Sequence, residues 1–193
     1  RLCWEGRPAP AALDLLLGDG DWGFADEGRT LHALIHALVL PRLYFMTGAW
    51  GNESNRGHLY ASYAGHTDVL DKATDLRPGM LEDIRRWDMD AFGRSWVMLG
   101  EWNVDNTWLP HPATRVSVDL ALATLEAVGE KRLSSIAERV FAEPYAYYRG
   151  WPDLMVLHRD GGLRFVEVKT TGRLYFGQIV TMSDMREAAS LDM

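Results

Sequence analysis

The segment from Gly150 to Lys169 carries the residue types that could perform chemistry in this chain. Asp153 follows Pro152, and Glu167 stands two residues before Lys169 in an apolar run. Two carboxylates and an ammonium at the edge of an apolar sheet are costly to desolvate unless a cation joins them. Oxygen ligands of this kind suit Mg²⁺ or Mn²⁺. Such a metal polarises a phosphodiester and lowers the pKa of a bound water, which Lys169 could orient or help to deprotonate, so the residues predict metal-assisted phosphodiester hydrolysis.

Two β-rich runs, residues 154–158 and 163–169, must position these side chains. An Asp-Gly-Gly turn separates the runs, and glycine supplies the positive φ angles that tight turns require, so we expect an antiparallel hairpin. Side chains alternate between the faces of a strand, which places Glu167 and Lys169 on one face. Asp153 begins the first run and should lie beside Glu167 across the hairpin.

Taken in order, Gly-x-Pro-Asp-Leu, Phe-Val-Glu-Val-Lys, and then Arg-Leu and Gln resemble the VRR-NUC branch of the PD-(D/E)XK nuclease superfamily. The resemblance covers about thirty residues and is specific as an ordered set. It implies that Asp153 and Glu167 bind the metal and that the backbone carbonyl of Val168 is a further ligand. It also implies catalytic roles for Lys169 and for Gln178 on the following helix, in addition to those of the two acids.

A second, shorter stretch upstream extends the resemblance. Residues 25–32, Ala-Asp-Glu-Gly-Arg-Thr-Leu-His, are similar to the helix start of the Fanconi-associated nuclease group, whose helix glutamate completes the metal site. This similarity implies that Glu27 is a metal ligand. Glu53 is a second candidate for that acid.

Contacts to DNA are predicted next to the acidic residues. Residues 170–172 read as a turn, after which a helix from about Tyr175 to Ala189 places Gln178 in its first turn. Arginine and amide side chains commonly bind the phosphates of nucleic acids. We therefore expect Arg149, Arg173 and Gln178 to contact DNA.

Composition favours an ordinary globular chain. The 193 residues are 47% hydrophobic and 24% charged, which indicates one domain. Cys3 is the lone cysteine, so we expect a reducing, cytoplasmic setting and a metal bound through oxygen. No signal peptide is visible, and residues 31–45 are too interrupted by polar residues and proline to cross a membrane.

Net charge weighs against broad, charge-driven binding of nucleic acid. The formal charge is −7 and the isoelectric point is near 5.3. Part of this charge belongs to acids that a metal would neutralise, and a neighbouring DNA-binding domain or protein partner could add affinity. Because the chain begins with Arg1, we expect a longer protein with domains upstream.

Helical patterns dominate the rest of the chain. Apolar residues recur at helical spacing from Glu27 to Phe45, after Pro78, and over 116–128 and 133–141, with Gly129 between the last two. The expected fold is α/β, a small mixed sheet flanked by helices as in PD-(D/E)XK nucleases. Residues 1–113 should form a largely helical part packed on a VRR-NUC catalytic core of residues 114–193.

Three other patterns could have a function, and two of them have more ordinary explanations. His32 and His36 have the spacing of a zinc pair, but the glutamate of a His-Glu-x-x-His motif is missing, so chance or a polar rim explains them better. The tryptophans at 87, 96, 102 and 108 could stack unpaired bases, although core packing fits their spacing better. Arg85 and Arg86, beside the apolar stripe of their helix, could touch phosphate.

These patterns support four hypotheses about function. The first is a divalent-metal-dependent DNA nuclease, structure-specific for flaps or junctions and acting in repair. The second is an antibacterial toxin nuclease that degrades DNA broadly. A third is a catalytically silent nuclease fold used for binding, and the last is an exposed, salt-bridged strand face with no catalytic role.

Overall fold

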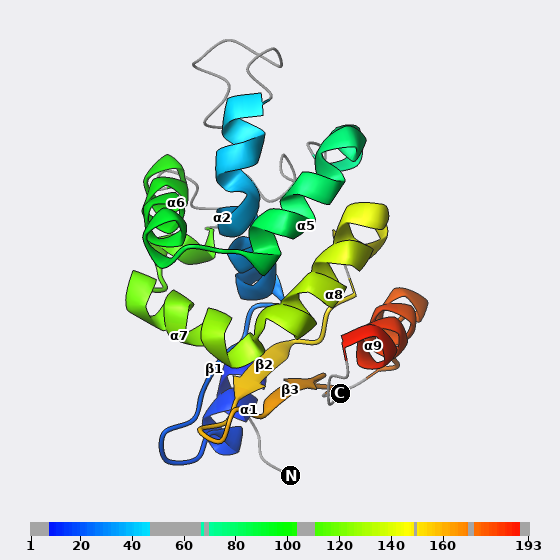
Figure 1. Ribbon diagram of the computed structural model, residues 1–193. Coiled ribbons are helices and arrows are strands. Elements are labelled where there is room, and N and C mark those ends of the chain that lie inside the picture. Colours follow the sequence, from blue (N-terminus) through cyan, green and yellow to red (C-terminus); the bar gives the residue numbers. More distant parts are fainter. Residues whose placement is uncertain are drawn as a thin grey trace.

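The computed structural model describes residues 8–46, 67, 70–103, 111–148, 150–169 and 172–189. Among these residues the helices are α1 (Pro8–Leu16), α2 (Arg29–Met46), α5 (Arg77–Arg85), α6 (Met89–Trp102), α7 (Val118–Val128), α8 (Glu130–Ala142) and α9 (Phe176–Ala189). Short 3-10 helices are η1 (Thr74–Leu76), η2 (Pro112–Thr114) and η3 (Ala146–Tyr148). The strands are β1 (Trp22–Phe24), β2 (Leu154–Leu157) and β3 (Leu163–Val166). Figure 1 shows one small sheet toward the lower end of the molecule with most of the helices above it, in agreement with the α/β class and with the mostly helical N-terminal part among the described residues.

The hairpin predicted around the Asp-Gly-Gly turn is present. Strands β2 and β3 pair antiparallel, with Leu154 opposite Val166 at the open end and Leu157 opposite Leu163 at the turn. The turn closes through backbone hydrogen bonds, and Gly161 adopts a φ of 86°, a left-handed conformation that glycine accepts without strain. Strand β3 ends at Val166, so it is shorter than the run from 163 to 169 that the sequence indicated.

A third strand comes from the N-terminal part of the chain. Strand β1 pairs antiparallel with β2, so the strand order is β1-β2-β3. The described sheet is therefore antiparallel, which corrects the mixed sheet expected from the sequence. The Trp22 indole N–H donates to the Thr124 hydroxyl of α7 (3.2 Å), whereas Gly23 faces Leu13 of α1 so closely that an added Cβ would lie 2.8 Å from it. Helices therefore cover both faces of β1.

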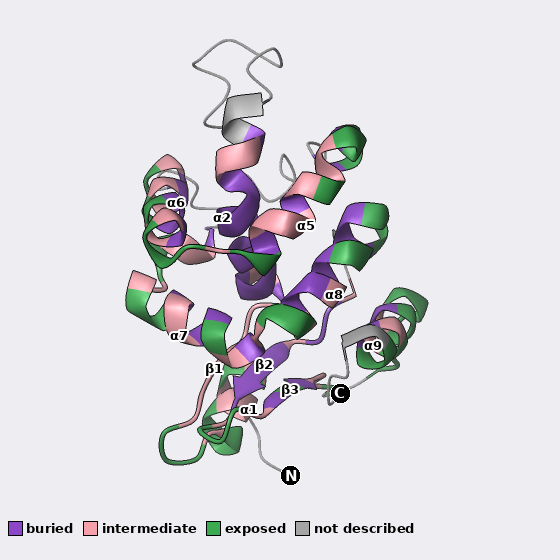
Figure 2. Ribbon diagram, viewed as in Figure 1, coloured by how far each residue is buried: buried purple, intermediate pink, exposed green. Residues whose placement is uncertain are grey.

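Helix α2 forms the centre of the core. All residues from Thr30 to Leu40 are buried, and the helix packs against α5 and α6 (Figure 2). Its aliphatic residues are buried on every side, as expected of a helix enclosed by others. Pro41 lies inside the helix and, lacking an N–H, cannot donate to the Ala37 carbonyl.

Helices α7 and α8 follow one another directly and diverge from their junction near the hairpin (Figure 1). The Ser117 hydroxyl caps α7 by accepting the Leu120 N–H (3.3 Å). Gly129, with a φ of 77°, ends α7 and starts α8, as the sequence predicted. Helix α8 then packs on α5 and on α9 (Figure 1).

Aromatic packing explains the described tryptophans better than a base-stacking platform does. Trp96 is 1% exposed, stacks on Phe92 at 5.7 Å between ring centroids, and donates its indole N–H to the Val116 carbonyl (2.9 Å). Trp87 and Trp102 are half-buried against the same core. The position at 108 lies outside the described residues.

The two histidines of α2 are buried, so a polar rim is the wrong explanation for them. His32 packs edge-on against Trp151 at 5.3 Å between ring centroids, and His36 packs edge-on against His111 at 5.9 Å. Within the described ranges, no three His, Cys, Asp or Glu side chains lie where they could jointly hold a metal. The structure therefore places the histidine pair in the core.

The two parts expected at 1–113 and 114–193 share one sheet, because β1 belongs to the first and β2 to the second. They also share one hydrophobic cluster that runs from Leu31 to Met185. No helix in the described part of the chain is long and apolar enough to cross a bilayer.

Candidate active site at the open end of the hairpin

The open end of the hairpin brings the two predicted acids together. Asp153 immediately precedes β2 and Glu167 immediately follows β3. The Asp153 N–H donates to Glu167 Oε2 (3.3 Å), and the Val168 N–H donates to Asp153 Oδ2 (2.8 Å). Each carboxylate thus accepts a backbone hydrogen bond from the opposite arm of the hairpin, which holds both beside the strand ends.

Lys169 and Gln178 converge on one oxygen of Glu167. The Glu167 side chain is only 6% exposed, and its Oε1 accepts from Lys169 Nζ (2.6 Å) and from Gln178 Nε2 (2.7 Å). The amide oxygen of Gln178 accepts from Lys169 Nζ (3.3 Å) and from the Tyr175 N–H (3.1 Å). Because the amide nitrogen faces a carboxylate and the amide oxygen faces two donors, its orientation is fixed.

The ammonium of Lys169 is held in its charged form. The hydrogen bond that Lys169 donates to Glu167 is the main cause that raises the pKa of Lys169, and the negative charges of Glu167 and Asp153 add to it. A raised pKa keeps the proton on Lys169 at neutral pH. Of the two roles expected from the sequence, orienting a water is therefore favoured over accepting its proton.

Glu27 lies in a turn before α2 rather than on the helix, which corrects the helical placement expected from the sequence. It has a φ of 56° and an exposed side chain, and its N–H donates to the Asp153 carbonyl (3.3 Å). Its neighbour Asp26 caps α2 by accepting the N–H (2.9 Å) and the hydroxyl of Thr30. Glu27 is adjacent to the site through its backbone, and its role as a metal ligand stays a prediction.

Trp151 connects the start of α2 to the hairpin. Its ring packs on Phe165 of β3 (5.8 Å between centroids) and against His32 (5.3 Å). Gly28, with a φ of 74°, lies so close that an added Cβ would be 2.7 Å from the indole ring. This close packing fixes the backbone two residues before Asp153.

Burial keeps two histidines of the core neutral. Desolvation lowers the pKa of His32 to about 4, and desolvation also lowers the pKa of His111 to about 4. His111 Nδ1 accepts the Ala113 N–H (3.1 Å), so its proton is on Nε2. Neither imidazole is suited to acid–base chemistry near neutral pH.

Exposed aromatic side chains border the site and were not among the residues predicted from the sequence. Arg173 is exposed just before α9, followed by Tyr175 (76% exposed) and Phe176 (81% exposed). Two adjacent aromatics within three residues of Gln178 were the available signal, but a sequence does not show that they stay outside the core. Arg149 and Glu53 lie outside the described residues, so their predicted roles are not placed.

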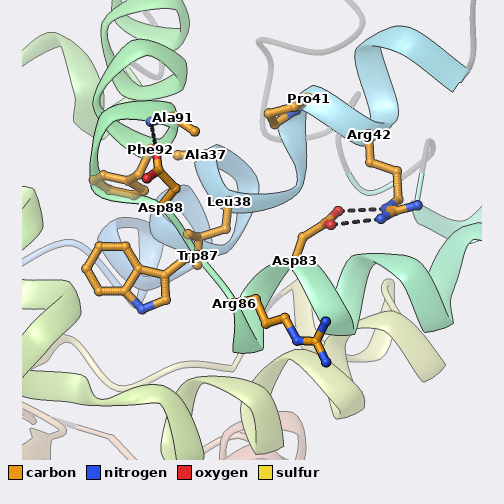
Figure 3. Close-up of a pocket in the computed structure, with 10 residues that line it drawn as sticks. All are labelled: Ala37, Leu38, Pro41, Arg42, Asp83, Arg86, Trp87, Asp88, Ala91 and Phe92. Atoms are coloured by element: carbon orange, nitrogen blue, oxygen red, sulfur yellow. Dashed lines mark hydrogen bonds and ion pairs between the residues drawn. The ribbon is translucent and has the colours of Figure 1, made fainter.

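A cavity of about 420 Å³ lies between α2, α5 and α6, and the acids at the open end of the hairpin do not line it (Figure 3). Its wall includes a bidentate ion pair in which Arg42 donates to both Asp83 oxygens (2.6 and 2.8 Å). The lining residues are Ala37, Leu38, Pro41, Arg42, Asp83, Arg86, Trp87, Asp88, Ala91 and Phe92. None of the predicted catalytic or metal-binding residues contributes to it.

The arginines of α5 that were expected to reach phosphate are engaged within the protein. Arg85 pairs with Glu138 of α8 (2.9 Å), and Arg86 pairs with Glu82 one turn earlier (2.7 Å). Both pairs are solvent-exposed, so they contribute little to stability. Because each arginine is already paired with a glutamate, the structure does not indicate phosphate binding at Arg85 or Arg86.

The donor set at the hairpin end fits a hard divalent cation. A carboxylate offers roughly four acceptor positions, and the three donors on Glu167 and the Val168 N–H on Asp153 leave lone pairs on both acids. Mg²⁺ is commonly bound through one or two carboxylates together with waters and substrate phosphates. Asp153 and Glu167 meet that requirement without a third acid.

Four predicted site residues, Asp153, Glu167, Lys169 and Gln178, are joined by hydrogen bonds. Comparisons of the chain with protein-family models, curated proteins and solved structures found no match.

Proposed function

We propose that this chain is a divalent-metal-dependent deoxyribonuclease that hydrolyses phosphodiester bonds in flapped or branched DNA, in a repair role. One observation carries the proposal: Lys169 and Gln178 converge on a nearly buried carboxylate oxygen of Glu167, which lies beside Asp153. These residues come from both arms of a hairpin and from the following helix. Their agreement with the order of the VRR-NUC motif adds support.

Asp153 and Glu167, with the backbone carbonyl of Val168, would hold Mg²⁺ or Mn²⁺. When bound, the cation supplies Lewis-acid polarisation of the phosphodiester and acidifies a water. The two acids supply opposite charge to it from a rigid frame, because each accepts a backbone hydrogen bond across the hairpin. Glu27 is a proposed further ligand from the adjacent turn.

Lys169 acts on the reacting groups, and Gln178 positions it. The Lys169 ammonium orients the attacking water and stabilises negative charge that develops on the phosphate oxygens. Gln178 holds that ammonium through its amide oxygen and holds Glu167 through its amide nitrogen. Arg173, exposed just before α9, is placed to bind an adjacent phosphate.

Burial separates this arrangement from an ordinary surface salt bridge. Exposed ion pairs contribute little and need no further hydrogen bonds. Glu167 is nearly buried and has three donors, although Lys169 remains partly exposed at 32%. The raised pKa of Lys169 beside this nearly buried acid marks a candidate functional site.

The experiment is cleavage of labelled flap, junction, linear duplex and single-stranded DNA in Mn²⁺, Mg²⁺ or EDTA. The chain is compared with Glu167→Gln and Lys169→Met, and with Lys131→Met on the exposed part of α8 as the control. We expect metal-dependent cutting that each site variant reduces by about 100-fold or more, while the control is unchanged. Cutting in EDTA, or equal cutting by the site variants, would contradict the proposal.

The substrate ranking separates the repair role from its alternatives. A repair nuclease should prefer flaps or junctions to plain duplex, whereas a toxin should degrade plasmid broadly. DNA binding without cleavage under any metal would favour the silent binding module instead. An absence of both binding and cleavage would leave the exposed, salt-bridged strand face as the explanation.

A further inference from the structure

Helix α9 begins with an unusual amount of exposed apolar surface. Tyr175 and Phe176, here called the aromatic pair, are 76% and 81% exposed. Leu174, Ile179 and Val180 beside them are between 40% and 49% exposed. Figure 2 shows much of α9 in the colour of exposed residues, while the neighbouring α8 is partly buried. Adjacent exposed apolar side chains commonly mark a binding surface.

The aromatic pair is continuous with the candidate active site. The Tyr175 N–H donates to Gln178 Oε1 (3.1 Å), and Lys169 Nζ lies 5.7 Å from the centroid of the Tyr175 ring. The ring therefore borders the ammonium that is proposed to act on phosphate. A molecule lying on the aromatic pair would extend directly into the site.

Charge identifies the kind of molecule that fits. Residues 168–183 contain Lys169 and Arg173 and no aspartate or glutamate, although the chain carries a net charge of −7. Lys169 pairs with Glu167 (2.6 Å), so the exposed Arg173 supplies the main positive charge beside the two solvent-facing aromatic rings. Single-stranded nucleic acid is bound by that combination, because cations attract the backbone while bases stack on aromatic faces.

We propose that the aromatic pair is a stacking platform for unpaired bases of DNA, next to the phosphate that Lys169 and Arg173 contact. The ligand class is a single-stranded segment, such as the unpaired arm of a flap. The position of the scissile phosphate rests on the proposed nuclease function, whereas the binding itself does not require cleavage.

The test is binding of a fluorescein-labelled oligothymidine, measured by anisotropy in EDTA at low salt. Tyr175→Leu/Phe176→Leu keeps apolar surface but removes both aromatic faces, while Tyr175→Phe/Phe176→Tyr keeps both. Ile179→Ser/Val180→Ser on the same helix is the control that removes aliphatic surface. All of these positions are exposed, and circular dichroism and thermal unfolding confirm that the variants fold.

We expect the leucine variant to bind the oligonucleotide about tenfold or more weakly, with the aromatic exchange and the serine control close to the unaltered chain. A blunt duplex of the same length should bind equally weakly to all four. Equal single-strand affinity of the leucine variant would overturn the proposal, as would undetectable binding by the unaltered chain. Self-association lost in the serine control, with no single-strand binding, would show an interface between copies instead.

The outcomes also separate this proposal from the nuclease function. Loss of single-strand binding in the leucine variant, in a chain that cleaves nothing, would support the platform and contradict the nuclease. Metal-dependent cleavage that the leucine variant performs with unchanged single-strand affinity would support the nuclease and contradict the platform.

Discussion

Polar side chains are buried in neutral form in helix α2 but keep their charges at the open end of the hairpin. In α2 the residues from Thr30 to Leu40 are buried, and His32 is kept neutral by burial. At the hairpin end the charges of Glu167 and Lys169 are retained and compensated by hydrogen bonds. Stability is therefore concentrated in one region, while the charged groups suited to chemistry are held in another.

The two regions are mechanically connected through Trp151. This ring contacts His32 of α2 on one side and Phe165 of β3 on another. A disturbance of the core should therefore lower the stability of the whole chain, whereas a disturbance of the acidic site should alter activity with little effect on stability. The following predictions test that separation.

Removal of a core aromatic should have the largest effect on stability. Trp96→Ala would leave a cavity beside Phe92 and leave the Val116 carbonyl without its indole donor. We expect the free energy of unfolding to fall by about 3–5 kcal/mol. Urea denaturation followed by circular dichroism measures the change, and a loss under about 1 kcal/mol would show that Trp96 does not lie in a packed core.

Acid should destabilise the chain through its buried histidines. The folded pKa of His111 is about 4, below the unfolded value near 6.5, so the unfolded chain binds more protons between these pH values and stability falls as pH falls through this window. The loss from His111 approaches roughly 3 kcal/mol by pH 4. The lowered pKa of His32 acts in the same direction.

The measurement is the free energy of unfolding at pH 7, 5.5 and 4.5. His111→Asn keeps an acceptor for the Ala113 N–H but cannot bind a proton, so its pH dependence should be shallower. An identical slope in the variant and the unaltered chain would contradict neutral burial of this imidazole.

The junction between the two regions should tolerate little change at Gly28. Gly28→Ala places a methyl group 2.7 Å from the Trp151 ring at a φ of 74°, so we expect a loss of about 2 kcal/mol in the free energy of unfolding. Gly177→Ala is the matched control, because an added Cβ there meets nothing within 4 Å. The control should leave stability unchanged or raise it by up to about 1 kcal/mol. Similar losses in both variants would contradict a tight junction.

Within the site, Gln178→Ala should have the smallest effect of the set and should alter activity more than stability. It removes the amide that joins Glu167, Lys169 and Tyr175, while leaving both acids and the ammonium in place. We expect cleavage to slow by about tenfold, which corresponds to about 1.4 kcal/mol in the activation free energy. Single-turnover cleavage at saturating metal measures it, and a rate equal to that of the unaltered chain would exclude a positioning role.

Local patterns in the sequence predicted the parts of the site that depend on neighbouring residues. The Asp-Gly-Gly turn was enough to place Asp153 beside Glu167, because a hairpin fixes which residues meet across its arms. Helical spacing placed Gln178 in the first turn of α9 for the same kind of reason.

Features that depend on contacts between residues far apart in the sequence could not be predicted from local patterns. Strand β1 has three residues and no alternating pattern, and it forms only because β2, far along the chain, offers an edge. Glu27 was expected on a helix, but the positive φ of Glu27 and Gly28 delays the start of α2 until Arg29. Burial of His32 and exposure of Tyr175 likewise depend on which surfaces other helices cover.

The most direct test of the central claim is Mn²⁺ binding measured by calorimetry in the absence of DNA. The unaltered chain is compared with Asp153→Asn and Glu167→Gln, and with Asp83→Asn at the distant Arg42 ion pair as the control. We predict that the unaltered chain and the control bind Mn²⁺ with the same affinity, and that each site variant binds at least tenfold more weakly. Equal binding by all four proteins, or none by the unaltered chain, would contradict a divalent-cation site formed by Asp153 and Glu167.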